Sequence, residues 1–216
     1  MAEIKNLVFD MGNVLLSYRW KEMLEVDRGL PKDRAFETAK VIFKSDIWKS
    51  LDRGDITPPQ AIEKFKEGYP DMGDDIEWFI HNYQDMPLPR EKTWKLVRTL
   101  KDRGYRIYIL SNYSQELYGM HAGIVERSIG LDGKVVSYEV HQLKPDKEIY
   151  VTLMEKYSLI PEECLFFDDL KENVEGAINA GMNSIVVKKE EDINRMLEKI
   201  ISMEKLDSNN LDQLSQ

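Results

Sequence analysis

The sequence contains very little cysteine, since Cys164 is the only one in 216 residues. An intrachain disulfide is therefore excluded, and a reducing, cytoplasmic setting is expected. The sequence also lacks an apolar run long enough to cross a membrane, and no apolar leader follows its first residues. With a net charge of −9, it lacks the positive surplus that nucleic acid or an anionic membrane attracts. We therefore expect neither nucleic acid nor a membrane among its partners.

What the sequence does have is the composition of a globular protein. Hydrophobic residues make up 42 % of the chain and charged residues 32 %, which is ordinary for a folded soluble domain. The length suits one domain, either alone or carrying an insertion. Nothing in the composition indicates an oligomeric state.

The first part of the chain changes its pattern after a short apolar run. Residues 4–9 are predicted to form a buried strand. A helical pattern then occupies residues 16–87. Within this block, Thr57, Pro58 and Gln60 form a typical helix start, with a capping residue, a proline in the first turn and a capping-box partner. A proline-rich segment ends the block, so we expect a separate helical unit here.

After the prolines, helices and strands alternate. We predict strands at residues 105–110, 135–136, 164–167 and 184–187, and helices at 91–103, 114–124, 147–157, 171–180 and 192–201. This order is typical of parallel βαβ units with right-handed crossovers.

The predicted fold is therefore α/β, a Rossmann-like doubly wound parallel sheet with a small all-helical cap inserted after the first strand. Residues 1–15 and 88–205 would form the core, residues 16–87 the cap, and residues 206–216 a polar, frayed tail. Ligands bind at the carboxyl ends of the strands in such sheets. The cap would therefore cover the binding site.

Polar side chains follow four of the predicted strands or the loops after them. Taken singly, each is more ordinary as a turn residue or a helix cap. Together they form a set of nucleophilic carboxylate, hydroxyl, cation and carboxylate pair at one sheet edge, and phosphoryl transfer with a hard metal ion needs these parts. The set consists of Asp10, Ser111 with Asn112, Lys144 with Pro145, and Asp168 with Asp169.

The segments around these residues resemble the four motifs of the haloacid dehalogenase superfamily, in the expected order. The segments are Phe9-Asp10-Met11-Gly12-Asn13-Val14-Leu15, Leu110-Ser111-Asn112, Lys144-Pro145 and Phe167-Asp168-Asp169. The FDxGNVL form is similar to that of a subgroup of sugar-phosphate phosphatases, one of which acts on α-D-glucose 1-phosphate. The cap segment 52–57 also resembles this subgroup. The resemblance implies a Mg²⁺-dependent phosphatase that acts on a small phosphorylated metabolite.

The resemblance also implies a role for each motif residue. Asp10 would be the nucleophile and a metal ligand, and Gly12 would offer its backbone carbonyl to Mg²⁺. Ser111 and the Asn112 backbone would bind the phosphoryl group, and Lys144 would neutralise Asp10 and the phosphate. For the last motif, the resemblance implies that Asp169 binds the metal directly and that Asp168 either binds it or supports its ligands. Asn173 would orient the loop that carries both.

One position departs from the superfamily pattern. Most of its phosphatases carry a second Asp two residues after the nucleophile, which protonates the leaving group, whereas this chain has Gly12. Three outcomes are open: another group or water takes the role, the substrate has a better leaving group, or the reaction is slow. General acid–base help is worth ~10²–10⁴-fold, so the difference matters.

The alternatives are a metal-independent 2-haloacid dehalogenase and a catalytically weak binding module that kept the fold. The acidic pair would have no task in a dehalogenase, and Gly12 is the sole support for a binding module. Among other residues, Arg53 is a candidate substrate contact from the cap and His141 a candidate for proton transfer. Less direct candidates are Arg19, which is expected to pair on its helix, and Trp20, Trp48 and Trp78, which would pack the cap or line a sugar pocket.

Overall fold

The computed structural model describes residues 2–215, and its core is a sheet of five parallel strands in the order β5-β4-β1-β6-β7. The predicted α/β fold is confirmed, with strand boundaries shifted by one or two residues. The strands are β1 (Asn6–Phe9), β4 (Arg106–Ser111), β5 (Gly133–Val136), β6 (Cys164–Asp168) and β7 (Asn183–Val186).

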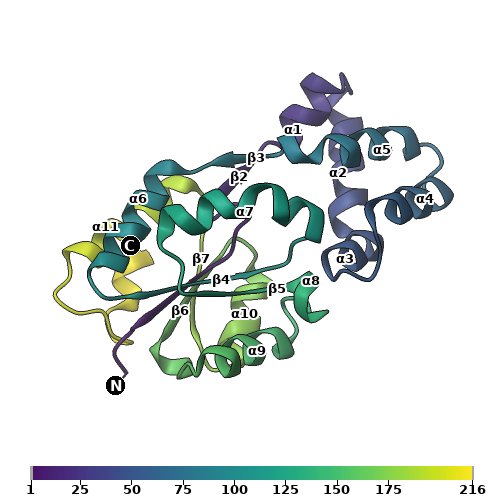
Figure 1. Cartoon of the computed structure of the whole chain (residues 1–216). Helices are drawn as coiled ribbons and strands as arrows, with labels where there is room; N and C mark the ends of the chain where they lie inside the picture. The colour runs from purple at the N-terminus through teal and green to yellow at the C-terminus, as the bar shows by residue number, and fades with distance from the viewer. Residues whose placement is uncertain (1, 216) are drawn as a thin grey trace.

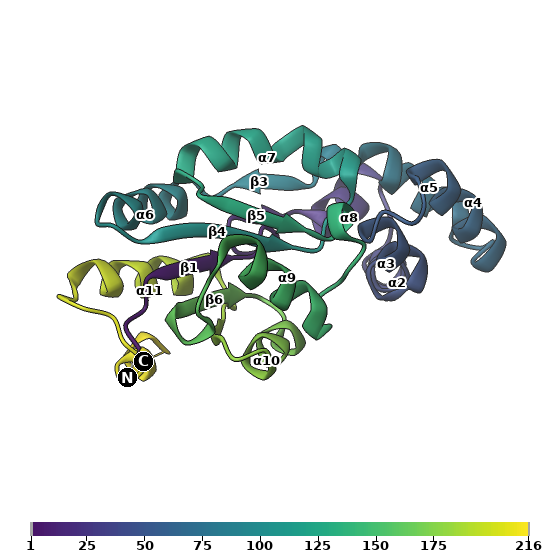
Figure 2. The same cartoon turned by 60° about the horizontal axis from the view of Figure 1, so that its bottom comes forward.

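Helices cover both faces of the sheet, as a doubly wound fold requires (Figure 2). Alternate side chains of β1 serve opposite faces, because Leu7 and Phe9 join one hydrophobic cluster and Val8 joins the other. The first cluster also contains side chains from α6 (Glu91–Asp102), α7 (Gln115–Ile129) and α11 (Glu190–Ser202), and the second contains side chains from α9 (Lys147–Tyr157) and α10 (Lys171–Asn179).

Helix α7 is longer than its predicted range of 114–124, since it runs to Ile129 and ends at Gly130 in a left-handed conformation with φ of 70°. Two glycines inside the helix, Gly119 and Gly123, weaken its local propensity and hide its length. Its buried face includes Leu117 and Val125, so packing against the sheet compensates for the weak propensity.

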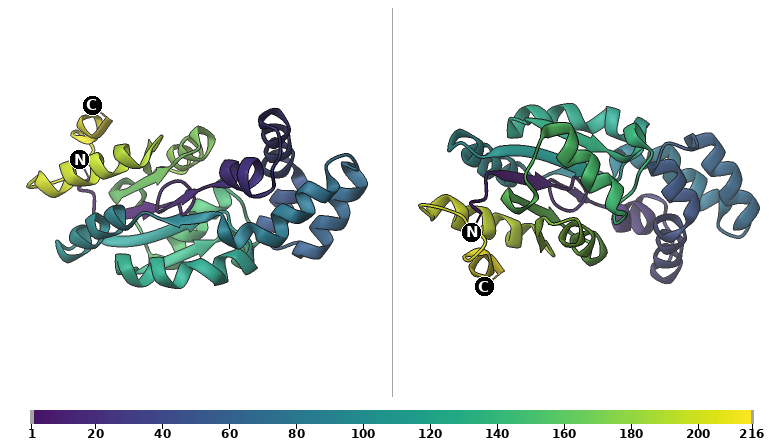
Figure 3. Two further views of the ribbon diagram at one scale, coloured as in Figure 1. Left: turned by 90° about the horizontal axis from the view of Figure 1, so that it is seen from above. Right: turned by 90° about the horizontal axis from the view of Figure 1, so that it is seen from below.

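The cap is a cluster of short helices at the end of the molecule opposite the two termini (Figures 1 and 3). Helix α4 begins at Pro58, and the Thr57 N–H donates to Gln60 Oε1 at 2.9 Å, as the capping box predicted. The cap elements are α1 (Trp20–Glu22), the π-helix η1 (Met23–Asp27), α2 (Lys32–Lys44), α3 (Asp46–Asp52), α4 (Pro58–Gly68), α5 (Gly73–Asn82) and the 3₁₀ turn η2 (Tyr83–Asp85).

The two chain segments that join cap and core pair with each other as an antiparallel ribbon. Strand β2 (Leu16–Tyr18) leads into the cap and β3 (Pro87–Pro89) leads out. The buried Arg90 fastens the ribbon to the core, because its guanidinium donates to Ser17 Oγ at 2.8 Å and to the Asn13 carbonyl at 2.6 Å. The sequence did not predict this ribbon, since three-residue strands leave no periodicity to read.

The C-terminal tail was expected to fray, and that expectation is wrong for the described part of it. Leu206 and Leu214 are fully buried in the larger hydrophobic cluster, and Asp207 forms a backbone bridge with Glu3. Residues Leu211–Ser215 form a 3₁₀ turn, η4. The polar composition of the tail concealed two leucines spaced to reach the core. Among the described residues, no helix combines the length and apolarity needed to cross a membrane.

Candidate active site

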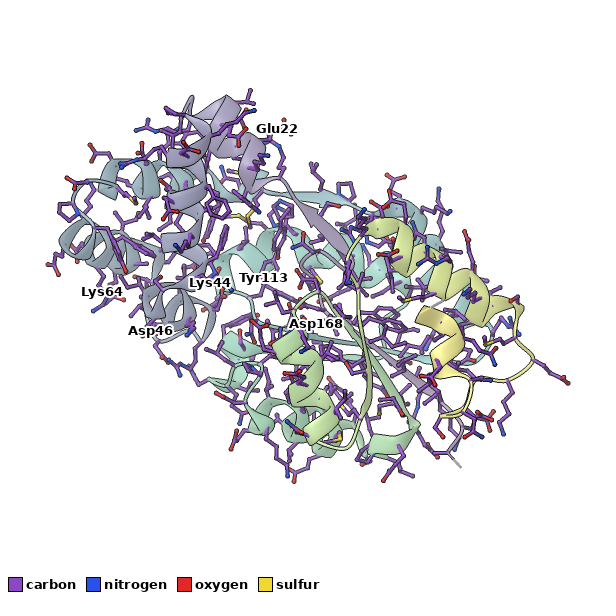
Figure 4. The ribbon with its side chains drawn as sticks, turned by 180° about the vertical axis from the view of Figure 1, so that it is seen from behind. Glu22, Lys44, Asp46, Lys64, Tyr113 and Asp168 are labelled. Carbon is purple, nitrogen blue, oxygen red and sulfur yellow. The ribbon has the colours of Figure 1, made fainter. Side chains whose placement is uncertain are left out.

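The polar residues that follow the strands meet at the edge of the sheet that faces the cap. Asp10 follows β1, Ser111 ends β4, Asp168 ends β6, and Lys144 lies in the loop after the short helix α8 (Ser137–Val140). Figure 4 shows Asp168 within the core and Tyr113 between it and the cap residues Lys44 and Asp46. The predicted convergence of four chain segments is therefore what the structure contains.

Asp10 lies at the centre of this group, nearly buried. Its Oδ1 accepts a hydrogen bond from Ser111 Oγ at 2.6 Å and lies 2.9 Å from the Nζ of Lys144. Burial raises the pKa of Asp10 to about 7, against the lowering effect of Lys144 and with a further rise from the charges of Asp168 and Asp169. The site thus carries more negative charge than its own cation compensates.

Lys144 links two of the motifs. Its Nζ donates to Asp168 Oδ2 at 2.6 Å and to the Leu110 carbonyl at 3.1 Å, in addition to its contact with Asp10. Burial alone would lower the pKa of Lys144, but the charges of Asp10 and Asp168 raise it above its usual value. The ammonium is therefore held in its charged form.

The backbone of Lys144 is fixed by Asn112. The Asn112 side chain accepts from the Lys144 N–H at 2.9 Å and donates to the Lys144 carbonyl at 3.0 Å. This reciprocal pair uses the Asn112 amide structurally and holds the lysine loop against the end of β4. The Asn112 backbone remains beside Ser111 at the same strand end.

The two carboxylates of the acidic pair have different surroundings. Asp168 is fully buried, and its oxygens accept from Lys144 Nζ, from the Leu170 N–H at 2.9 Å and from Asn173 Nδ2 at 3.0 Å. Asp169 is partly exposed and accepts from Asn13 Nδ2 at 3.0 Å. Asp168 is thus tied into the protein, and Asp169 has an oxygen to offer toward the cavity.

Three carboxylates of this site could share one cation. Asp10, Asp168 and Asp169 each present an oxygen, and these oxygens all lie within 4.8 Å of one another. Burial, opposed by the hydrogen bond from Asn13, raises the pKa of Asp169 as well. Oxygen ligands and a surplus of negative charge fit a hard divalent cation such as Mg²⁺.

A side chain at position 12 would collide with the ring of Tyr18 where that ring now lies. A Cβ placed on Gly12 would lie 2.7 Å from Cε2 of Tyr18 and 2.9 Å from its Cζ. The Tyr18 N–H in turn donates to Asn13 Oδ1 at 3.3 Å, which fixes the strand that carries the ring. The aromatic ring therefore occupies the space that a side chain at position 12 would enter.

A cavity of about 620 Å³ opens above Asp10 and is closed on its far side by the cap. Arg53, the candidate substrate contact, lies in its wall and pairs with Asp55 at 2.7 Å. The core supplies charged and polar groups to this cavity, and the cap supplies aromatic and charged side chains. Its cap residues include Trp20, Phe43, Lys44, Asp46, Trp48, Lys49, Asp52 and Arg53.

The remaining candidates lie away from the cavity. His141 Nδ1 is 3.0 Å from the Arg53 carbonyl on the outer side of the cap–core junction, and its side chain is 65 % exposed. Arg19 pairs with Glu22 and Asp27, as the pairing interpretation expected. Trp78 stacks with Arg28 instead of lining the cavity.

Sequence reasoning missed Asp52, Tyr18 and Tyr113 as site residues. All three line the cavity. Asp52 belongs to the cap segment that resembles the phosphatase subgroup, which was the one available signal. Tyr18 lies in a strand of three residues and Tyr113 in a loop, and neither segment has a periodic pattern. Their place in the site depends on how the cap folds over the sheet.

Comparison with known proteins yields one family match over most of the chain. The model of the haloacid dehalogenase-like hydrolases matches residues 4–181. The sesquiterpene phosphatase astK of Aspergillus oryzae is 28 % identical over 82 % of this chain and 87 % of its own length. The drimenol cyclase drtB of Aspergillus calidoustus is 25 % identical over 91 % of this chain, which spans 36 % of the length of that protein.

Solved structures share the fold. The HAD family enzyme bt-2542 of Bacteroides thetaiotaomicron, solved as a magnesium complex, has a TM-score of 0.64 at 23 % identity, covering 86 % of this chain and 94 % of its own. A dehalogenase with an intermediate complex has a TM-score of 0.68 at 16 % identity, covering 87 % and 86 %. At these identities the likeness extends to the arrangement of the chain and no further.

Proposed function

Because the chain belongs to the haloacid dehalogenase-like hydrolases, we propose that it is a Mg²⁺-dependent phosphatase that hydrolyses a small phosphorylated metabolite through an aspartyl-phosphate on Asp10. One observation carries the proposal: Asp10, at the floor of the cavity, shares Oδ1 contacts with Ser111 and Lys144 and lies in a cluster of three carboxylates. A metal-independent reaction would leave that excess of negative charge without a purpose.

The proposed binding mode uses the ends of two strands and the lysine loop. The Ser111 hydroxyl and the Asn112 backbone N–H donate to the phosphoryl oxygens, and Lys144 neutralises charge on the phosphate and on Asp10. When the phosphate binds, the Ser111 hydroxyl exchanges its 2.6 Å bond to Asp10 for one to the substrate. Asp10 is thereby released to attack phosphorus.

Asp10, Asp169 and the Gly12 carbonyl would hold the metal, with Asp168 as a further ligand or as the support of Lys144. Asp169 is the better direct ligand, because Asp168 is buried and its oxygens already accept from Lys144, Leu170 and Asn173. Bound Mg²⁺ supplies positive charge that allows a carboxylate to approach an anionic phosphate.

The cavity suits a small soluble substrate. Its volume of about 620 Å³ is in the range of small-molecule sites. Trp20 and Trp48 offer aromatic faces on which a sugar ring could stack, and Arg53 and Lys49 offer donors for hydroxyl or phosphate groups. We propose a sugar phosphate as the substrate. The sesquiterpene phosphatase among the relatives makes a terpenyl phosphate the informative comparison.

The test is hydrolysis of p-nitrophenyl phosphate, with Mg²⁺ and with chelator, by the wild type and by Asp10→Asn. We expect turnover that requires Mg²⁺ and disappears in the variant. A panel of sugar phosphates, together with one terpenyl phosphate, then identifies the substrate class. Absence of Mg²⁺-dependent turnover on p-nitrophenyl phosphate and on the whole panel would contradict the proposal.

Dehalogenation is the second candidate, because Gly12 removes the acid–base Asp of the phosphatases and a dehalogenase shares the fold. Chloride release from 2-chloropropionate in the presence of chelator would favour it. The carboxylate pair of Asp168 and Asp169 supports phosphate chemistry instead, since an anionic halo acid gains nothing from three nearby carboxylates.

A further inference from the structure

The proposed reaction needs a proton donor for the leaving group, and the loop after β1 cannot supply one. Gly12 has no side chain, and the Tyr18 ring fills the space beside it. Burial raises the pKa of Tyr18 well above its usual value, so its phenol is a poor acid. A side chain that donates this proton must therefore belong to another part of the cavity wall.

Asp52 lines that cavity from the cap side. It is the last residue of α3 and lines the same cavity as Asp10. Tyr18 and Tyr113 lie near both carboxylates, since the negative charges of Asp10 and Asp52 each raise the pKa of both phenols. Asp10 and Asp52 thus line the same cavity, one from the core and one from the cap, and the negative charge of Asp10 acts on the pKa of Asp52.

Three contacts fix the turn that follows Asp52 against helix α8 of the core. Ser137 Oγ donates to the Asp52 carbonyl and accepts from the Tyr113 N–H at 2.9 Å. His141 Nδ1 lies 3.0 Å from the Arg53 carbonyl. Gly54, with φ of 77°, packs so closely on Tyr138 that a Cβ would lie 3.1 Å from its carbonyl oxygen. This set of contacts, the Asp52 latch, holds the backbone of the turn against the core, while hydrogen bonds from the Trp48 side chain and the Ser114 backbone reach the Asp52 carboxyl group itself.

The other acidic groups in the cavity wall are less suited to the role. Asp46 has a side chain 96 % exposed and pairs with Lys49 at 3.1 Å. Asp146 and Glu172 are exposed at the rim. Asp169 belongs to the cluster that fits the metal. Among the described acidic residues of the cavity wall outside the metal cluster, Asp52 is the one that is half-buried.

We propose that Asp52 is the general acid and base of this enzyme, delivered by the cap in place of the side chain that Gly12 lacks; this rests on the proposed phosphatase function. In the first step, an Asp10 oxygen forms a bond to phosphorus, the bond from phosphorus to the leaving oxygen breaks, and Asp52 gives that oxygen its proton. In the second step, water attacks phosphorus and gives a proton to Asp52. The bond to Asp10 breaks, phosphate leaves, and both carboxyl groups return to their starting states.

The electrostatics of Asp52 support this role. Burial, followed by the negative charge of Asp10, raises the pKa of Asp52 to about 7, while Trp48, Lys144 and Ser114 lower it. A carboxylic acid with this pKa is partly protonated at neutral pH and becomes a base after it has given up the proton.

Two substrates with different leaving groups test the proposal. Benzyl phosphate leaves as a basic alkoxide that needs a proton, whereas p-nitrophenyl phosphate leaves as a stable phenolate. In Asp52→Asn, kcat/KM should fall ~10²–10⁴-fold for benzyl phosphate and by about tenfold or less for p-nitrophenyl phosphate. Asp52→Glu, which keeps a proton, should recover part of the loss on benzyl phosphate. Asp74→Asn, an exposed cap residue outside the cavity, is the matched control and should leave both substrates unaffected.

The pattern across the two substrates separates the outcomes. Turnover of p-nitrophenyl phosphate shows that Asp52→Asn folds with its nucleophile intact. Equal losses on both substrates, or no loss on benzyl phosphate, would overturn the role of Asp52 and leave the phosphatase function standing. Wild-type protein that hydrolyses neither of these esters nor any member of the substrate panel would overturn both proposals together.

Discussion

The Tyr18 ring occupies the space beside the Gly12 backbone, so that any Cβ on residue 12 would lie 2.7 Å from a ring carbon. An Asp placed at position 12 would therefore meet the ring, so the ring of Tyr18 would have to move to admit it.

Substitution at position 12 is the first prediction. Gly12→Ala should lower the free energy of unfolding by about 1–3 kcal/mol through overpacking against Tyr18. The double variant Gly12→Ala with Tyr18→Ala should lose less than the two single losses added together, because the clash is gone. Urea unfolding of the four proteins measures this coupling. Strict additivity would contradict the steric explanation.

Metal binding is the second prediction. Mg²⁺ should raise the melting temperature of the wild type, since a ligand at about 100 times its Kd stabilises the folded state by about 2.7 kcal/mol. In Asp169→Asn this shift should be much smaller, because a cavity-facing oxygen ligand is lost. In chelator the same variant should melt higher than the wild type, since the pKa of Asp169 is raised by its burial and its charge repels Asp168. The control Asp74→Asn should keep the full Mg²⁺ shift.

Loss of the buried cation is the third prediction. Lys144→Met should lower the free energy of unfolding by roughly 3–5 kcal/mol, because it leaves Asp10 and Asp168 without their shared partner. Adding Asp168→Asn should recover part of the loss by removing one stranded charge. Both variants are compared by urea unfolding in chelator. A double variant no more stable than Lys144→Met would argue that the loss comes from packing and not from charge.

The pH dependence of stability is the fourth prediction. The pKa of Asp52 is raised from 3.8 to about 7 on folding, so the folded state holds this proton more tightly than the unfolded state. The contribution of Asp52 to stability is therefore greatest at low pH and is lost as pH rises through this window. Relative to the wild type, Asp52→Asn should gain stability between pH of about 4.5 and 8. Urea unfolding in chelator at the two pH values measures it, and Asp74→Asn should show no such gain.

The sequence predicted the site residues that the core domain supplies, but few of those that the cap supplies. Asp10, Ser111, Lys144 and Asp168 follow strands of a parallel sheet, and strand order alone brings such positions to one edge. The position of Asp52 in the same cavity as Asp10 could not be predicted, because it depends on how a helical block folds back over the sheet. A helical pattern gives the buried face of each helix but not which loop meets the strand ends.

Smaller misses have similar physical causes. The ribbon of β2 and β3 is held by pairing between residues 16–18 and 87–89, which local pattern cannot reveal. Leu206 and Leu214 are buried although their surroundings are polar, because two side chains suffice to attach the tail to the larger core. Composition is an average over a whole segment, whereas the packing of the tail against the core depends on these two leucines.

Because β2 and β3 pair with each other, the two connections between cap and core form one hinge. Both connections run side by side and are fastened near this hinge by Arg90, so the cap is expected to swing as one body between open and closed positions. Under our proposals, the nucleophile Asp10 belongs to the core, and the proton donor Asp52 moves with the cap. A phosphoester too bulky for the cap to close over it would reach Asp10 without a proton donor, and an ester with a basic leaving group would then be hydrolysed only slowly. Closure of the cap would then both exclude large substrates and supply the proton, so that substrates are selected by whether the cap can close over them.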